Sequence, residues 1–525
     1  MRGEPTYDHV HGLYRLALAR RFTGTLSADA VALLRRAVMS ARAADARRLS
    51  VLALRTAGAL DSATMFTAFA DRDAQVRRLA LGGVAALGPS ARAELVRRAF
   101  ADASPIVRIE AVAAARVGMQ RPDCSGIIAA TRDEEPHVMI MAIDALGSPC
   151  ADSATAHAAL RAIVDRPPVT WQISEHARLA LARAGYPRTI DSVTAARADS
   201  SAEAAARVYG VRAEAIRGNT AMLLRLAAMK NRDHNVHEAL IQGLAQTVKH
   251  DADSVYVAAL ASKGYQVVLA AAQALAGSSY TPAVPRLYDA FDRLSAERRE
   301  NARDPRLEIL KRLSELGSKD GAARLQPYLT DFDTTVAQTV AGMLTRWTGA
   351  SVVARARPLP IRAESLAVVF LRREVRLRVT MAGVNGGSFV VRLFADEAPA
   401  TVARMIRLAR SDYYNGTVFQ RVEPNFVVQG GGPDASEYVG DSLFMRDEVS
   451  FRAHKRGTVG ISSRGRDTGD GQMFVNLADN PALDHEYTVV GEVVTGQAVV
   501  DRMLERGRIE RVEEVRLGPL PRPRP

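Results

Sequence analysis

The stretch FQRVEPNFVVQGGG, residues 419–432, carries polar side chains where an ordinary strand would be apolar. Its pattern predicts two short strands around a turn at residues 423–425, yet Arg421 and Gln429 stand among the apolar residues. Burying a guanidinium or an amide without partners costs about 1–3 kcal/mol or more per group. We therefore interpret Arg421 and Gln429 as parts of a functional site, in which the guanidinium is a permanent cation and hydrogen-bond donor.

The commonest catalytic constellations are missing around this stretch. The region after residue 375 has two histidines, His454 and His485, no cysteine and no nucleophile elbow, and the turn-like context of His485 favours a structural role. Glycines 430–432 lead into the loop sequence PDASEYVGD and not into a helix, so they do not predict a phosphate-binding loop. No acidic cluster has metal-ligand spacing. The sequence thus predicts chemistry without a metal, cofactor or covalent nucleophile.

A second polar and aromatic stretch, RGTVGISSRGRDTGDGQMFVNLADNPALDHEYTVVGEVVTG, occupies residues 456–496. The two stretches together resemble the cyclophilin family of peptidyl-prolyl cis-trans isomerases. The family hallmark F-x-R-x-x-P-x-F-x-x-Q-G-G is met at residues 419–431. LFADEAPATV at 393–402 and YYNGTVFQRV at 413–422 are similar to the segments that precede it in the family. The resemblance covers about residues 375–515.

The resemblance implies a site made of ten residues. Arg421 falls on the catalytic arginine of the family. Phe426 and Phe474 fall on the aromatics that wall the proline pocket, and Gln429 and Gln472 on the residues that orient the arginine and hold the peptide backbone. The implied peptide-binding residues are Phe426, Val427, Gln429, Ser462, Ser463, Gln472, Phe474, Leu483 and Tyr487.

Five positions depart from the usual family pattern. Val427 stands where methionine is usual, and Ser462 and Ser463 occupy a stretch that is commonly Ala-Asn. Tyr487 stands where many eukaryotic members carry histidine and bacterial members often have tyrosine. Ala482 replaces a bulky aromatic at the pocket rim, which argues against cyclosporin sensitivity. These departures leave a second interpretation open, a weakly active or inactive scaffold that binds proline peptides.

Isomerisation of a prolyl bond suits a site of this composition. Rotation about the bond has a barrier of about 18–20 kcal/mol because the amide loses its resonance when it is twisted. The twisted state localises the lone pair of the prolyl nitrogen, and a guanidinium can donate to that lone pair. Arg421 would then bind the transition state better than either ground state, which is the condition for catalysis.

The elements expected to hold the site are short strands. VRLRVTM at 375–381 and SFVVRLF at 388–394 are joined by AGVNGG, whose Asn-Gly predicts the tip of a hairpin. A helix with Pro399 in its first turn and a final helix near 496–505 are the only helical patterns expected here. We predict a closed β-barrel capped by two helices, a cyclophilin-like isomerase domain, over residues 375–516.

The first part of the chain repeats a helical pattern every 31 residues. DRDAQVRRLALGGVAAL begins at residue 71, DASPIVRIEAVAAARVG at 102 and DEEPHVMIMAIDALG at 133. Equivalent positions are Val76, Val107 and Val138, then Ala80, Ala111 and Ala142, then Leu81, Val112 and Ile143. Alanine allows close approach of helices, and the branched residues fill the space between layers. A unit of two helices at this period predicts a stacked solenoid.

Weaker copies of the unit lie at 45–60, 234–246, 265–277 and 333–344. The sequence resembles the HEAT-repeat family over about residues 30–350, which implies an interaction surface and no chemistry. We predict a multidomain chain. Its parts are an all-α HEAT-like solenoid at 1–350, a linker at 351–374, the barrel at 375–516 and a Pro/Arg tail at 517–525.

Charge and composition limit the partners. Residues 376–525 hold 20 Lys+Arg and 20 Asp+Glu, so the net charge of +12 belongs to residues 1–375. Nucleic-acid binding by this basic part is a lesser alternative, because no basic run is interleaved with aromatics that stack on bases. The expected partners are proline-containing peptides or unfolded clients at the barrel and a protein on the solenoid. No apolar run reaches the 18–20 residues, roughly, that span a bilayer.

The cysteines and the start of the chain bear on its compartment. Cys124 and Cys150 fit no metal-ligand spacing, and we expect two packed thiols that do not pair. Residues 1–25 hold no apolar core of a secretory signal, so the cytoplasm is the default expectation. A trimmed or misassigned start would leave a periplasmic or secreted protein as the alternative.

Overall fold

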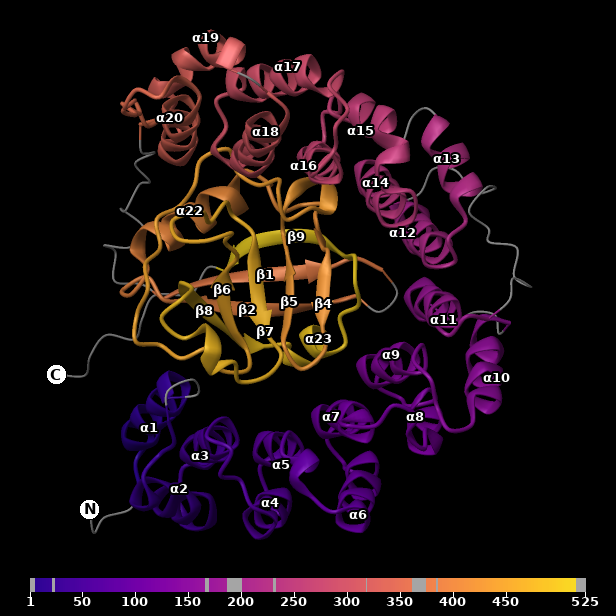
Figure 1. Cartoon of the computed structure of the whole chain (residues 1–525). Coiled ribbons are helices and arrows are strands. Elements are labelled where there is room, and N and C mark those ends of the chain that lie inside the picture. The colour runs from indigo at the N-terminus through magenta and orange to yellow at the C-terminus, as the bar shows by residue number, and fades with distance from the viewer. Residues whose placement is uncertain are drawn as a thin grey trace, which may run out of the picture. The chain divides into compact units, whose positions relative to one another are not determined.

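The computed structural model of the 525-residue chain describes residues 5–20, 24–165, 170–186, 201–229, 233–317, 319–360, 374–383 and 386–515. Its contacts form two compact units, residues 1–186 and 187–525. The first unit is helical, and the second contains further helices followed by a sheet (Figure 1). The hairpin tip expected at 384–385, most of the expected linker (361–373) and the expected tail at 517–525 lie outside the described residues.

Helices of the first unit alternate between two layers. The odd-numbered helices from α1 to α11 contact one another in order along one layer, and each even-numbered helix packs beside an odd-numbered one. Such i to i+2 contacts are the arrangement of a helical solenoid. The helices are α1 (Tyr7–Arg20), α2 (Ala28–Ser40), α3 (Ala44–Thr56), α4 (Ser62–Phe69), α5 (Ala74–Leu81), α6 (Pro89–Phe100), α7 (Pro105–Arg116), α8 (Ser125–Ala130), α9 (Pro136–Ala145), α10 (Ser153–Val164) and α11 (Trp171–Arg183).

The 31-residue repeat marks the buried face of one layer. The nine equivalent valine, alanine, leucine and isoleucine positions lie on α5, α7 and α9, and each is at most 1% exposed. Burial of all nine confirms that the repeated positions form the interior of the helical stack. The apolar area removed from water between successive units is the main favourable term that holds such a stack together.

An arginine–aspartate pair also recurs at the same interval. Arg108 of α7 donates from Nε and Nη2 to the two carboxylate oxygens of Asp133, at 2.7 and 2.8 Å. The same carboxylate accepts from the Glu135 amide just before α9, at 2.9 Å. Burial alone would raise the pKa of Asp133, but the hydrogen bonds from Arg108 and the Glu135 amide lower it below its ordinary value. Equivalent bidentate pairs are Arg47–Asp71 and Arg77–Asp102.

Because the aspartate both accepts from the amide just before one helix and binds an arginine of the preceding unit, its pair should contribute measurably to stability. We expect Arg108→Met to lower the free energy of unfolding by about 2 kcal/mol, as for a partly buried charged hydrogen bond. Arg97→Met is the matched control, since Arg97 pairs with Glu94 at an exposed site where the effect should stay below about 0.5 kcal/mol. Calorimetric melting of both variants checks this, and equal shifts in the two variants would contradict the interlocking role.

The two cysteines form a disulfide, so the expectation of two unpaired thiols is wrong. Cys124 immediately precedes α8 and Cys150 follows α9, and the turn between these helices brings their Cα atoms to 5.8 Å. Both side chains are buried. The pairing depends on how two helices fold back on each other, which a spacing of 26 residues in the sequence does not reveal.

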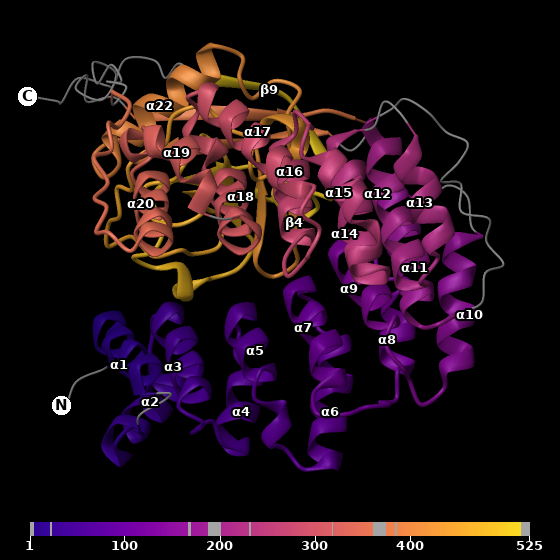
Figure 2. The same cartoon turned by 45° about the horizontal axis from the view of Figure 1, so that its top comes forward.

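The helices of the second unit continue the same alternation. α12, α14, α16, α18 and α20 contact one another in order and lie beside the sheet, whereas α13, α15, α17 and α19 lie on the outside (Figures 1 and 2). No helix among the described residues combines the length and the apolar character needed to cross a membrane. The helices are α12 (Ser201–Ile216), α13 (Thr220–Ala228), α14 (His234–Thr247), α15 (Asp253–Ala259), α16 (Tyr265–Ala274), α17 (Ala283–Ala296), α18 (Arg303–Leu316), α19 (Ala322–Leu325) and α20 (Thr334–Thr348).

Nine antiparallel strands form the sheet in the order β3-β9-β1-β2-β8-β6-β7-β5-β4. A bridge between Val418 of β3 and Gly432, just after β5, connects one end of this order to the strand next to its other end, so the barrel is nearly closed, as predicted. Helix α22 (Pro399–Arg410) begins at the predicted proline, and the last helix, α23 (Gln497–Asp501), is shorter than expected. The strands are β1 (Val375–Met381), β2 (Gly387–Leu393), β3 (Val418–Phe419), β4 (Arg421–Glu423), β5 (Val427–Gly430), β6 (Thr458–Ile461), β7 (Met473–Asn476), β8 (Val489–Thr495) and β9 (Gly507–Val515).

One irregular part of the barrel, residues 434–444, is bound to the helices of this unit, and we call it the anchored segment. Tyr438 and Val439 pack against the apolar core formed by α12 to α20. The backbone of Glu300 donates to the carbonyl of Ser442 at 2.9 Å, and its carboxylate accepts from the Phe444 amide at 2.6 Å. The anchored segment therefore depends on the helices as well as on the barrel.

Arg464, which follows β6, is a second link between barrel and helices. Its Nε donates to Asp304 at the start of α18, at 2.5 Å, and its guanidinium lies 5.5 Å from the ring centre of Tyr438. Its Nη1 donates to the buried carboxylate of Asp470 at 3.4 Å. Burial raises the pKa of Asp470 to about 6, although the charge of Arg464 opposes this rise. These contacts fix the edge of the barrel that borders the candidate site.

Candidate functional site

Arg421 and Gln429 face each other across a tight hairpin of strands β4 and β5. Arg421 is paired directly with Gln429 in the strand register, and Asn425 in the turn between them adopts a left-handed backbone with φ of 59°. The guanidinium Nη1 donates to the amide oxygen of Gln429 at 3.2 Å. The amide nitrogen of Gln429 in turn donates to the hydroxyl of Ser462, at 2.8 Å. The glutamine amide thus holds the arginine and is itself held by Ser462, which directly follows β6.

A cavity of about 140 Å³ opens in front of this hydrogen-bond chain. Strand alternation brings Val427 and Gln429 to the same wall, as the sequence predicts. The Arg421 side chain keeps 45% of its surface exposed and its guanidinium carbon lies 5.8 Å from the ring centre of Phe426. Predicted site residues that line the cavity are Arg421, Phe426, Val427, Gln429, Ser462, Ser463, Phe474, Leu483 and Tyr487.

Gln472 is the one predicted site residue that does not line this cavity. It is 1% exposed, and its amide nitrogen donates to the carbonyls of Glu437 and Val439 at 3.1 and 3.2 Å. Its amide oxygen accepts from Gln420 at 2.8 Å. In this geometry Gln472 supports the anchored segment from behind, so it acts on the cavity through the position of Glu437.

The far wall of the cavity is aromatic. The rings of Phe474 and Tyr487 meet edge to face with centres 5.8 Å apart. Gly460 on the adjacent strand allows this position of Phe474, because a Cβ there would come within 2.3 Å of the phenyl ring. His454 stacks on the opposite face of the wall, 5.6 Å from Phe474. An apolar recess of this kind suits a small ring such as that of proline.

Several residues of the site were not anticipated from the sequence. Glu437 and Arg464 line the cavity although both lie in loops with no strand or helix pattern. His454 is 1% exposed and supports the aromatic wall from outside the cavity. Its neighbour Asn476, buried beside it, is a polar residue inside an apolar strand, the same signal that pointed to Arg421. The described residues hold no cluster of three His, Cys, Asp or Glu side chains suited to a metal ion.

Comparison with known proteins finds relatives of the barrel region. The family model described as cyclophilin type peptidyl-prolyl cis-trans isomerase/CLD matches residues 376–517. A peptidyl-prolyl cis-trans isomerase of Helicobacter pylori is 37% identical over 132 residues, which are 24% of this chain and 81% of that protein. A Schizosaccharomyces pombe enzyme of the same name is 35% identical over 122 residues, 22% of this chain and 79% of the relative.

Solved structures give a more distant match. The crystal structure of a cyclophilin-type peptidyl-prolyl cis-trans isomerase of Cryptosporidium parvum has 21% sequence identity to this chain. The match extends over the whole length of that structure and over 28% of this chain, and its TM-score is 0.26. A second structure of that protein, in the presence of the dipeptide Ala-Pro, has 22% sequence identity to this chain. The match extends over 26% of this chain and 96% of that structure, and its TM-score is 0.24.

His454 leads to a pH prediction. Its Nε2 donates to the carbonyl of Tyr487 and its Nδ1 accepts from Asn476, each at 3.4 Å, so the neutral ring satisfies both nitrogens. Burial lowers its pKa to about 4. A histidine with a lowered folded-state pKa binds fewer protons than the unfolded chain, so its contribution is present above its unfolded pKa and is lost as pH falls from about 6.5 to 4.

We compare wild type with His454→Gln, which cannot take up the proton. As pH falls from about 6.5 to 4, the free energy of unfolding should decrease by on the order of 3 kcal/mol more in the wild type than in the variant. Unfolding by denaturant, followed by a spectroscopic signal of the tyrosine and phenylalanine side chains of the barrel, provides the measurement. NMR of the His454 ring should show the neutral form at pH values near 5.5. A ring that is fully protonated at that pH would contradict the assigned hydrogen bonds.

Proposed function

Because this chain belongs to the cyclophilin-type peptidyl-prolyl cis-trans isomerase family, we propose that Arg421 is its catalytic residue and that the aromatic recess holds the proline ring of a client. The chain is an isomerase, and the reaction makes and breaks no covalent bond. The observation that carries the residue assignment is the hydrogen bond from Arg421 to Gln429, which fixes the guanidinium at the mouth of the recess.

The catalytic step follows from the electronic structure of the amide. In the planar bond the prolyl nitrogen shares its lone pair with the carbonyl and accepts hydrogen bonds poorly. As the bond twists, the lone pair localises on nitrogen, and the Arg421 guanidinium donates to it. The donor is charged and held in advance, so little reorganisation is needed in the transition state. Phe426, Phe474 and Leu483 grip the ring while the carbonyl side of the bond rotates.

Two side chains support the peptide backbone in this proposal, and a third shapes the floor of the recess. Ser462 and Ser463 line the recess beside Gln429 and offer hydroxyl groups where a peptide strand would pass. Ser462 already accepts from Gln429, so its own hydroxyl hydrogen is free to reach a client carbonyl in the described geometry. Val427 leaves more room in the floor of the recess than a longer side chain would, which favours looser binding of the ring.

The helices of residues 1–350 are proposed to be HEAT-like repeats that recruit clients or place the isomerase in a complex. The alternating layers and the buried 31-residue repeat support this assignment. A weakly active scaffold that binds proline peptides is the second candidate, favoured by Val427 and Ser463. Both candidates share the same recess, so turnover distinguishes them.

We predict that Arg421→Ala lowers kcat/KM for an Ala-Pro test peptide by about 100-fold, as for loss of one preorganised donor. Arg421→Lys should recover little activity, because a lysine lacks the planar fork that Gln429 orients. Arg446→Ala is the control, since Arg446 is an exposed arginine of the same barrel that pairs with Asp467 away from the recess. Equal rates for wild type and Arg421→Ala would favour the scaffold.

We also propose that the protein functions in an oxidising compartment, periplasmic or extracellular, and not in the cytoplasm. The disulfide between Cys124 and Cys150 supports this, because such bonds persist mainly outside reducing compartments.

The compartment proposal predicts the redox state of the chain in its native cells. Cells quenched in acid and alkylated should yield Cys124 and Cys150 as an unmodified, linked peptide pair, whereas alkylated thiols would place the chain in a reducing compartment. In the purified protein, Cys124→Ser with Cys150→Ser should cost about 3 kcal/mol of stability, because the disulfide closes a loop across a separation of 26 residues.

A further inference from the structure

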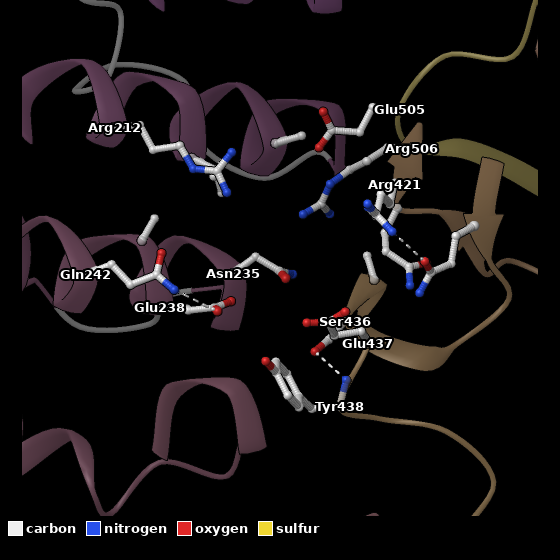
Figure 3. A pocket seen from close by; sticks show the side chains of 16 residues that line it. Arg212, Asn235, Glu238, Gln242, Arg421, Ser436, Glu437, Tyr438, Glu505 and Arg506 are labelled. Atoms are coloured by element: carbon white, nitrogen blue, oxygen red, sulfur yellow. Dashed lines mark hydrogen bonds between the residues drawn. The ribbon is translucent and has the colours of Figure 1, made fainter. Parts of the chain in front are cut away.

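A second cavity, of about 300 Å³, adjoins the proline recess. Three residues, Arg421, Gln429 and Glu437, line both cavities, so the two share a wall. Figure 3 shows that one side of the second cavity comes from the barrel and the other from the helices α12 and α14. The helical residues are Ala205, Val208 and Arg212 of α12 and Asn235, Glu238, Ala239 and Gln242 of α14.

Hydrogen bonds on both sides of this cavity hold the helices against the barrel. The hydroxyl of Tyr209 on α12 donates to Glu505, just before β9, at 2.5 Å. The amide of Asn235 on α14 donates to the carbonyl of Asp434 at 2.9 Å, and the ring of His234 lies 3.4 Å from the Asp434 carboxylate. The cavity is thus built by the tertiary structure and is not a gap beside a loosely attached helix.

Two carboxylates, Glu238 of α14 and Glu437 of the anchored segment, enter the cavity from opposite walls (Figure 3). Burial, opposed by the charge of Arg212 and reinforced by that of Glu437, raises the pKa of Glu238 to about 7. The Glu238 carboxylate accepts from Gln242 at 3.1 Å. The remaining charged groups that line the cavity are Arg212 on α12 and Arg421, Glu505 and Arg506 on the barrel.

Two of the three arginines that line the cavity have other partners or roles, and the third, Arg506, lies on the barrel side next to Arg421 (Figure 3). Arg212 lies over the ring of Tyr209 at 5.7 Å, and Arg421 is held by Gln429 at the proline recess. Glu505 already accepts from Tyr209. The space between Glu238 and Glu437 is therefore bordered by two carboxylates on opposite sides, and no arginine of the described residues forms an ion pair with either, so it suits a lysine or arginine side chain.

We propose that the second cavity extends the peptide groove and receives a lysine or arginine of the client close in sequence to its proline. The client enters both cavities as one polypeptide, because each residue of an extended chain advances by about 3.3–3.6 Å and the two cavities share three residues. The helices α12 and α14 thereby give the isomerase a sequence preference that the barrel by itself does not have. This inference rests on the proposed use of the proline recess.

The experiment measures peptide binding to the full-length protein by fluorescence anisotropy. The probes are labelled peptides with a central Ala-Pro, carrying lysine, alanine or glutamate in turn at each of the three positions on either side. The ratio of alanine-peptide to lysine-peptide Kd is compared for wild type, Glu238→Gln and the control Glu510→Gln, an exposed carboxylate on β9 outside the cavity. A ratio within one protein cancels any general change in the proline recess.

At about pH 8 we expect lysine at one position to bind about five-fold more tightly than alanine, equivalent to about 1 kcal/mol. The ratio should fall toward one in Glu238→Gln and stay unchanged in Glu510→Gln. It should also fall in the wild type as pH decreases from about 8 to 6, because Glu238 takes up a proton near pH 7. A purely structural role of Glu238 would weaken all peptides equally and leave the ratio unchanged.

Three results would overturn the inference. One is the absence of any lysine preference in the wild type, and another is a preference that survives Glu238→Gln. The third is a preference for glutamate, which would assign the cavity to its arginines. If the alanine peptide is bound and isomerised in these cases, the proposed function stands and only the extended groove fails. If no proline peptide is bound, the proposed use of the recess fails with it.

Discussion

The site depends on one side chain amide, that of Gln429, which accepts from Arg421 and donates to Ser462. A guanidinium on an exposed strand would otherwise sample many rotamers, and its hydrogen bond to a client nitrogen would then cost ordering entropy at each encounter. The strand register removes this cost in advance because it places residues 421 and 429 opposite each other. The tight turn at Asn425 and the closely packed Gly460 help to keep that pair beside an aromatic recess.

The helices take part in the site through the anchored segment. Tyr438 packs against the helical core while its neighbour Glu437 lines the recess, so one short stretch of chain contacts both structures. Gln472 ties the same stretch to the barrel from within. A displacement of the helices would therefore move a wall of the groove, which is a physical route by which a partner on the helices could influence the isomerase.

The fold and most of the recess could be predicted from the sequence, but the signal that made the prediction possible was different for each. The 31-residue period identified buried positions such as Val76 and Ala80 because a solenoid repeats its contacts locally. The recess residues were found because polar side chains in short strands matched a family motif. The family motif assigned Gln472 to the site, but its contact with the anchored segment, and not with the recess, could be seen only from the packing. The cysteines were misjudged because their approach depends on a turn between two helices.

Residue types and periodicity by themselves determined the order of the parts and the buried face of the repeats, since each depends on neighbours within a few residues or on a repeated interval. The role proposed for Arg421 came from the family motif around it. Tertiary structure alone decided the disulfide, the paired carboxylates of Glu238 and Glu437, and the wall that α14 adds to the groove. Glu238 and Glu437 are about 200 residues apart in the sequence, and no local pattern encodes such a meeting because it depends on how the whole second unit packs.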